Sequence, residues 1–325
     1  MDSASRRSAK YDNLKALLIF LVVFAHLQNL FSGPRSEVLY RTIYIFHMPA
    51  FVFVTGRFAK FDLRGILTRQ LLPYLFFQVL YITWDRLVLG TPWTLQFTTP
   101  RWILWYLLSA ALWRLLLPLV DTERAGRMAL TLALSLGLAL AAGYCPRLGF
   151  CLSLSRTVVF LPFFLLGLYW GRLERRMPPP SRRAGIAAGV LAAALSRALL
   201  ERGATRGLLY GALSYADCEC GPGLRLLQLL AAGCWICALV CLTPDRRIPG
   251  VTALGRSTLP VFLLHGLAVR CLAAAGWFSG GSEARNLAMA LVLTAALLAA
   301  LGNPRAAALF RLPGSPGAEK NHPGH

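Results

Sequence analysis

The chain has 325 residues, of which 56% are apolar and only 15% are charged, and its mean hydropathy is +0.55. This composition excludes an ordinary soluble globular protein and indicates a chain that crosses a membrane several times. The formal net charge is +20, but the cations lie in short connections between apolar runs. We therefore interpret them as determinants of membrane topology and expect no nucleic-acid partner.

Apolar runs recur along almost the whole chain. The first run carries Lys15 and His26 and has no cleavage-site pattern after it, so we expect a retained span instead of a signal peptide. In chain order the sequence predicts ten spans, at residues 14–31, 42–54, 71–84, 102–117, 128–142, 157–170, 184–200, 224–242, 257–276 and 287–301. The predicted fold class is an all-α integral membrane protein with about ten transmembrane helices.

The distribution of Lys and Arg predicts the orientation of these spans. With the N-terminus inside, 22 of the 34 cations fall on inner segments, as expected for loops that face the cytoplasm. An even number of spans then places both termini in the cytoplasm. Residues 303–325, rich in Pro and Gly, are predicted to form a flexible tail after a transmembrane domain at residues 1–302. We expect a multi-pass protein of a bacterial inner (plasma) membrane, and the sequence leaves the oligomeric state open.

Three histidines inside predicted spans lie 9 to 11 positions from a cation at the predicted inner boundary. The pairs are His26 with Lys15, His47 with Arg57, and His265 with Arg256. At 1.5 Å per residue, each histidine lies about 14–16 Å from that boundary. An ionisable side chain inside a bilayer is costly and marks a functional site, so we predict that the three histidines share one polar cavity. Any one of these histidines, taken alone, is equally well explained by packing. We expect no metal site, because no Asp or Glu lies at the predicted depth of the histidines.

Several segments carry patterns beyond apolar periodicity. Ten residues separate Lys15 from His26, residues 45–51 read Ile-Phe-His-Met-Pro-Ala-Phe before Thr55-Gly56, and residues 254–265 run from Leu-Gly-Arg-Ser-Thr-Leu to Leu-Leu-His. Together these segments resemble the membrane-bound acyltransferase 3 family. Residues 104–114 resemble the fourth-helix motif of its fucose 4-O-acetylase-like branch, and Ser109-Ala110-Ala111 stands where many members outside that branch carry Glu-Glu.

The resemblance implies an integral membrane O-acyltransferase that moves an acetyl group from cytoplasmic acetyl-CoA to a sugar hydroxyl of a cell-envelope or secreted glycan. Acetyl-CoA is then a cosubstrate, and no cofactor is bound permanently. The predicted catalytic residues are His26, His47 and His265, because an imidazole that titrates near neutral pH suits a general base or a nucleophile. The predicted donor-binding residues, which would hold the CoA phosphates at the inner mouth, are Lys15, Arg57, Arg64 and Arg69.

Two other functions remain open at this stage. A transporter or flippase of a glycan or small metabolite would also have ten spans and a polar cavity near the midplane, although the sequence shows no inverted repeat. A non-catalytic assembly subunit would leave the intramembrane histidines unexplained.

Smaller features have simple interpretations. Asp85 is interpreted as a solvated residue near a span end. Cysteines at positions 145, 151, 218 and 220 lie in predicted outer loops, where a disulfide between the two loops is an alternative to free thiols.

Overall fold

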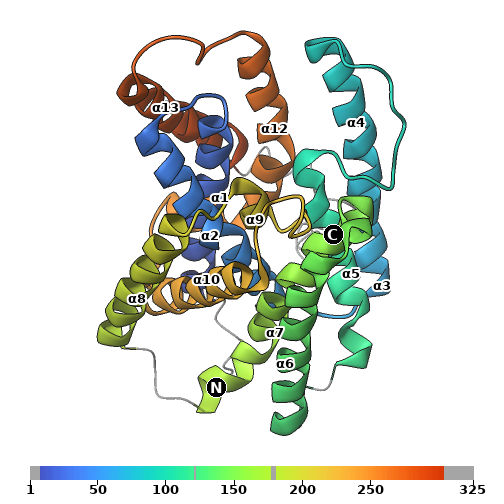
Figure 1. Ribbon diagram of the computed structural model, residues 1–325, viewed down its shortest axis with the longest axis vertical. Coiled ribbons are helices and arrows are strands. Elements are labelled where there is room, and N and C mark those ends of the chain that lie inside the picture. The colour runs from blue at the N-terminus through green and yellow to red at the C-terminus, as the bar shows by residue number, and fades with distance from the viewer. Residues whose placement is uncertain (1–7, 121, 177–180, 304–325) are drawn as a thin grey trace, which may run out of the picture.

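The computed structural model describes residues 8–120, 122–176 and 181–303, and these residues form helices and connections without a strand. Figure 1 shows the arrangement. The α-helices are α1 (Ala9–Gln28), α2 (Pro34–Arg57), α3 (Leu63–Ile66), α4 (Leu72–Leu89), α5 (Trp105–Leu115), α6 (Ala125–Ala141), α7 (Leu154–Arg176), α8 (Arg182–Glu201), α9 (Arg206–Tyr210), α10 (Pro222–Leu242), α11 (Val251–Arg256), α12 (Thr258–Ala274) and α13 (Glu283–Leu301). A π-helical turn, Leu67–Leu71, leads into α4, and a 3-10 turn, Trp102–Leu104, leads into α5.

The all-α membrane prediction is confirmed, because eight helices of the described chain are long and apolar enough to cross a membrane. Each of the ten predicted spans coincides with a helix. The helices α4 and α12 lie outside that set of eight, and α12 is an apolar helix of 17 residues. The number of ten spans and the cytoplasmic side of both termini stay predictions. The predicted tail, apart from Asn303, lies outside the described residues.

Helix α2 begins eight residues before the predicted span. Its first turns contain Glu37 and Arg41, and these charges led the sequence pattern to exclude them from the span. In the folded chain Glu37 accepts hydrogen bonds from Arg41 and, across the fold, from Arg206 of α9. Paired charges of this kind extend a helix beyond its apolar run, since each one satisfies the other.

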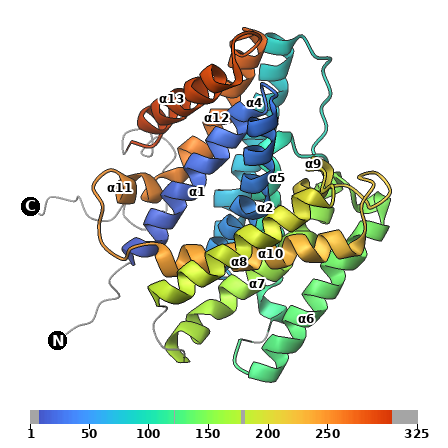
Figure 2. The same cartoon turned by 60° about the vertical axis from the view of Figure 1, so that its left-hand side comes forward.

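The core of the fold is a close contact between α2 and α7. A Cβ placed on Gly56 would lie 2.0 Å from the carbonyl oxygen of Phe164, and one placed on Gly167 would lie 2.0 Å from that of Phe53. Glycine at both positions therefore lets the two backbones approach one another, as small residues do in membrane helix pairs. The helices α8 and α10 form a second close pair, side by side in Figures 1 and 2.

Polar contacts tie helix ends together at one end of the bundle. Buried Asp12 in α1 forms ion pairs with Lys15, at 2.9 Å, and with Arg256 of α11, at 3.2 Å. The Tyr11 hydroxyl donates to Glu174 near the end of α7, at 2.7 Å. We call this the Lys15 end of the bundle. The opposite end, where α1 finishes and Asn29 accepts a hydrogen bond from Arg206, is called the Asn29 end.

Candidate active site

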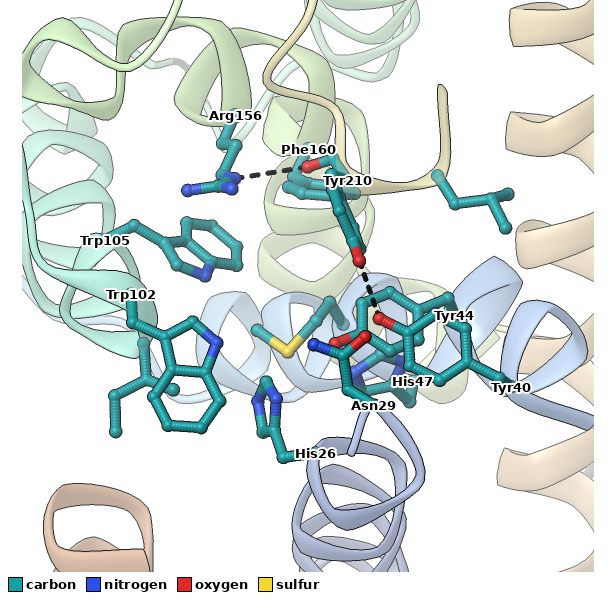
Figure 3. Close-up of a pocket in the computed structure, with 13 residues that line it drawn as sticks. His26, Asn29, Tyr40, Tyr44, His47, Trp102, Trp105, Arg156, Phe160 and Tyr210 are labelled. Atoms are coloured by element: carbon teal, nitrogen blue, oxygen red, sulfur yellow. Dashed lines mark hydrogen bonds between the residues drawn. The ribbon is translucent and has the colours of Figure 1, made fainter. Parts of the chain in front are cut away.

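A cavity of 260 Å³ surrounds His26. Its lining includes His26, His47, Trp102, Trp105, Arg156 and Tyr210, which come from α1, α2, the turn before α5, α5, α7 and α9 (Figure 3). We call it the histidine cavity. Residues far apart in the sequence thus meet around the one histidine that the first apolar run contains. Its size suits a small ligand or one end of a larger ligand, since sites for drug-sized molecules start at about 300 Å³.

The structure brings the three predicted histidines together. The ring centroids of His26 and His265 are 5.3 Å apart, and His47 lines the same cavity as His26. His26 also packs edge-on against Trp102, with 4.5 Å between ring centroids. His47 and His265 are buried, whereas His26 is partly exposed to the cavity. Among the three, His26 is therefore placed to meet a substrate, and His265 lies behind it.

Two of the histidines are oriented by their own helices. Nδ1 of His47 bonds the carbonyl oxygen of Ile43, and Nδ1 of His265 bonds that of Val261, each at 2.8 Å. A carbonyl oxygen only accepts, so Nδ1 donates in both cases and the neutral ring keeps its lone pair on Nε2. Nε2 of His265 is buried and has no hydrogen-bond partner in the described part of the chain. This leaves a buried acceptor next to the ring of His26.

A second cavity lies between the Lys15 end and the histidine cavity. It has a volume of 290 Å³, and Lys15, Thr55, Tyr106 and Arg114 are among its lining residues. We call it the middle cavity. Met48 lines both this cavity and the histidine cavity. The two cavities therefore adjoin at Met48, a flexible side chain.

A third cavity, of 550 Å³, opens next to the middle cavity at the Lys15 end. Its lining includes Lys60, Asp62, Arg69 and Arg114, and we call it the basic cavity. It shares Thr55, Tyr106, Leu107, Arg114 and Leu259 with the middle cavity. We call this series of adjoining cavities, from the basic cavity through the middle cavity to the histidine cavity, the passage. Its cations lie at the Lys15 end, an arrangement suited to a long ligand with a polyanionic head.

The fold places only two of the four predicted donor-binding residues in this passage. Lys15 and Arg69 line this passage, in the middle and the basic cavity respectively, and Arg69 forms an ion pair of 3.0 Å with Asp62. Arg57 instead lines a separate cavity with Arg172 and pairs with Glu174 at 3.2 Å. Arg64 is exposed and lines neither the middle nor the basic cavity. The role of Arg57 and Arg64 stays a prediction from the sequence.

Comparison with known proteins decides the family. The family model described as an acyltransferase domain matches residues 8–302. The protein belongs to the acyltransferase 3 family. No curated protein and no solved structure shows a significant match to the chain. The family match runs from the start of α1 to the end of α13, so all three cavities of this acyltransferase lie within the family domain.

The acyltransferase carries site residues that the sequence alone did not single out. Arg156, Tyr44 and Tyr210 all line the histidine cavity, although no motif in the sequence points to them. Arg114 lines both the middle and the basic cavity. Arg114 and Arg156 each lie near the end of an apolar run, where a cation resembles an ordinary topology signal. The available signal was the placement of Arg156, a cation directly before a span on the predicted outer side.

Asp85 of the acyltransferase is buried, so its interpretation as a solvated residue is wrong. Helix α4 continues past the predicted span end to Leu89, which carries Asp85 inside the fold. There it forms ion pairs with Arg270 of α12, at 2.6 Å, and with Arg101, at 3.5 Å. The sequence pattern could not show this, because both partners are distant along the chain. A buried carboxylate is stable only with such partners.

The Asp85 cluster supports one wall of the histidine cavity. The Arg270 guanidinium lies 5.2 Å from the ring of Trp102, the side chain that packs against His26. Trp102 has φ of 42°, in the left-handed region that a bulky residue seldom adopts. The chain before it is held by Gln78 of α4, which bonds the backbone of Gln96, Thr99 and Arg101. Helix α4 thus determines where Trp102 stands.

The eight cysteines are all free. Cys218 is buried and Cys145 and Cys151 are exposed, so the alternative of a disulfide between the two loops finds no support in this structure.

Proposed function

We propose that this acyltransferase transfers an acetyl group from acetyl-CoA to a sugar hydroxyl of a cell-envelope or secreted glycan. The observation that carries the proposal is the passage from the basic cavity, through the middle cavity, to His26. It provides separate places for a polyanionic donor and for a small acceptor, with an imidazole between them. The motifs that resemble the fucose 4-O-acetylase-like branch support acetyl as the acyl group and a sugar as the acceptor.

In this proposal the donor binds from the Lys15 end. Lys60, Arg69 and Arg114 hold phosphates of CoA in the basic cavity, and Lys15, in the middle cavity, pairs with the phosphate from which the pantetheine arm begins. The arm then follows the middle cavity toward Met48. Lys15 and His26 are eleven positions apart on α1, a rise of about 16 Å, and the extended pantetheine arm is of similar length. The thioester is thereby delivered to the histidine cavity.

In the proposed reaction His26 acts as the general base that takes up and returns the proton. The acceptor hydroxyl gives its proton to the His26 ring while its oxygen attacks the thioester carbonyl carbon. The tetrahedral intermediate collapses, the carbon–sulfur bond breaks, and the CoA sulfur leaves with the proton that His26 returns. The lone pair on Nε2 of His265 favours the imidazolium that forms transiently on His26. A second route, in which a His26 nitrogen first takes the acetyl group as an acyl-imidazole, uses the same residues.

The proposed donor path also implies an orientation of the protein in the membrane. Acetyl-CoA is cytoplasmic, so the Lys15 end faces the cytoplasm and the Asn29 end faces outward across a bacterial inner membrane. The acceptor then enters the histidine cavity from the Asn29 end. Donor and acceptor meet at His26 without crossing the bilayer as whole molecules.

Comparative glycan mass spectrometry tests this function. Cells that express the parent chain are compared with cells that lack the gene and with cells that express His26→Ala at equal membrane levels. We expect glycan species heavier by one acetyl group in the parent cells only. Identical glycan masses in all three strains would refute the proposal and would favour a transporter, which moves its substrate unmodified.

A further inference from the structure

One cation in the histidine cavity, Arg156, has no acidic partner among the residues that the structure describes. Arg156, in the first turn of α7, donates through Nε to the carbonyl oxygen of Tyr210 at 3.2 Å. Its guanidinium lies 5.2 Å from the ring of Trp105 and 5.3 Å from the ring of Phe150. These contacts hold the plane of the guanidinium, and Figure 3 shows it across the cavity from His26. Within the described residues no carboxylate pairs with it.

The surroundings explain why the charge is uncompensated. The residues that line the histidine cavity include no Asp or Glu. Glu37, an acidic residue at the same end of the fold, is already bound by Arg206 and Arg41. A partly buried cation without a counter-ion is unfavourable, because the low dielectric of its surroundings strengthens its field and water solvates it incompletely. A ligand that brings a negative charge into the cavity would remove this cost.

The rest of the wall suits a carbohydrate. Trp102, Trp105 and Tyr44 present aromatic surface to the cavity, and rings of this kind pack against the apolar faces of sugars. The hydroxyl groups of Tyr40 and Tyr210 are joined at 2.7 Å, with oxygen lone pairs left to accept hydrogen bonds from a sugar. A planar guanidinium with two free NH₂ groups is matched by a carboxylate or a phosphate, which it binds in a bidentate manner.

We propose that the acceptor sugar carries an anionic group, a carboxylate or a phosphate, which pairs with Arg156 while a hydroxyl of the same glycan faces His26. This inference rests on the proposed function and adds a substrate class to it. Arg156 selects the acceptor and takes no part in donor binding, because the donor passage reaches the cavity from the Lys15 end at Met48.

Binding of defined sugars to the purified full chain in detergent tests this assignment. The probes are methyl glucoside, which is neutral, methyl glucuronoside, which carries a carboxylate, and glucose 1-phosphate. Ligand-observed NMR measures their affinities for the parent, Arg156→Gln and Arg156→Lys. The matched control is Arg147→Gln, which removes the same charge from an exposed position near the same end, outside the cavity lining. Acetyl-CoA binding is measured on each variant to show that it is folded.

We expect at least one anionic probe to bind the parent and Arg147→Gln about tenfold more tightly than methyl glucoside, which corresponds to about 1.4 kcal/mol. Arg156→Gln should lose this preference and keep acetyl-CoA binding, and Arg156→Lys should retain part of it. The probe that binds more tightly identifies the carboxylate or the phosphate as the natural group. Equal affinity of the parent for all three sugars, or a preference that survives in Arg156→Gln, would overturn the assignment.

The two proposals fail in different ways. If glycan mass spectrometry finds acetylation but the sugars bind equally, the transferase function stands and the anionic acceptor is wrong. If Arg156 confers the preference but no acetylated glycan is found, the cavity recognises an anionic sugar and the transferase function is wrong.

Discussion

Replacing Lys15 by alanine is expected to raise the KM for acetyl-CoA while leaving kcat close to that of the parent enzyme. Lys15 lines the middle cavity, which adjoins the histidine cavity at Met48, and its side chain is 21% exposed. A contact with the CoA head is made equally in the ground state and the transition state, so its loss weakens binding without slowing the chemical step.

The size of the effect follows from what surrounds Lys15. A hydrogen bond between charged groups contributes about 1.5–3 kcal/mol. Lys15 already shares its charge with Asp12, at 2.9 Å, and Arg114 lines the same cavity, so we expect the low end of this range. A loss of about 1.5 kcal/mol corresponds to an increase in KM of slightly more than tenfold. Asp12 keeps its ion pair with Arg256 in the variant, which limits the cost to folding.

The assay is steady-state acetyl transfer in membranes, normalised to the amount of inserted enzyme and measured over a range of acetyl-CoA concentrations. Arg57→Ala is the matched control. Arg57 lies at the same end of the bundle, is 27% exposed and pairs with Glu174, but it lines a different cavity. The geometry predicts the parent KM for this variant, although the sequence alone placed Arg57 with the donor-binding residues.

Two results would refute the reasoning. The parent KM in Lys15→Ala, with less enzyme in the membrane, would mean that Lys15 only anchors α1 at the membrane surface. An equal rise in KM for Lys15→Ala and Arg57→Ala would mean that the charge of the whole Lys15 end, and not the passage, attracts the donor.

Three further predictions follow from the fold and the site. His26→Ala should lower acetyl transfer by about 10²–10⁴-fold, the usual contribution of a general base, with unchanged membrane insertion; a normal rate from well-inserted enzyme would remove His26 from the chemistry. Reporter fusions at His325 should show a cytoplasmic C-terminus, and an outward-facing reporter would contradict the predicted topology. Gly56→Ala should destabilise the detergent-solubilised protein by about 1–3 kcal/mol, because its Cβ would meet the carbonyl oxygen of Phe164 at 2.0 Å. The control Gly233→Ala, with no atom within 4 Å of the added Cβ, should not lower the thermal unfolding temperature, and equal losses in both variants would contradict the close packing of α2 and α7.

Much of the membrane architecture follows from local sequence. Every predicted span coincides with a helix, because an apolar run in lipid must satisfy its own backbone hydrogen bonds and does so as a helix wherever it lies in the fold. The predicted ends of the spans were less accurate than the positions of the spans. The first turns of α2 were excluded because Glu37 and Arg41 are charged, and Arg206, which helps to neutralise Glu37, is distant along the chain.

The grouping of His26 with His47 was also within reach of the sequence, since their distances from Lys15 and Arg57 indicate a common depth. Depth does not indicate direction around a helix axis or which neighbour a helix packs against. The rotation of a helix about its axis and its packing partner depend on tertiary contacts such as that of Gly56 with α7. These contacts place Lys15 in the lining of the passage and Arg57 in the lining of another cavity.

The sequence by itself determined the apolar helices, the position of His26 within the first of them and the family motifs, since each depends on residues close together in the chain. Only the tertiary structure decided that Arg156 faces His26 across a cavity and that Asp85 is buried between two arginines. The physical reason is that the stability of a charge inside a membrane protein depends on its partners. Those partners come from other helices, and no local pattern specifies which of them will meet.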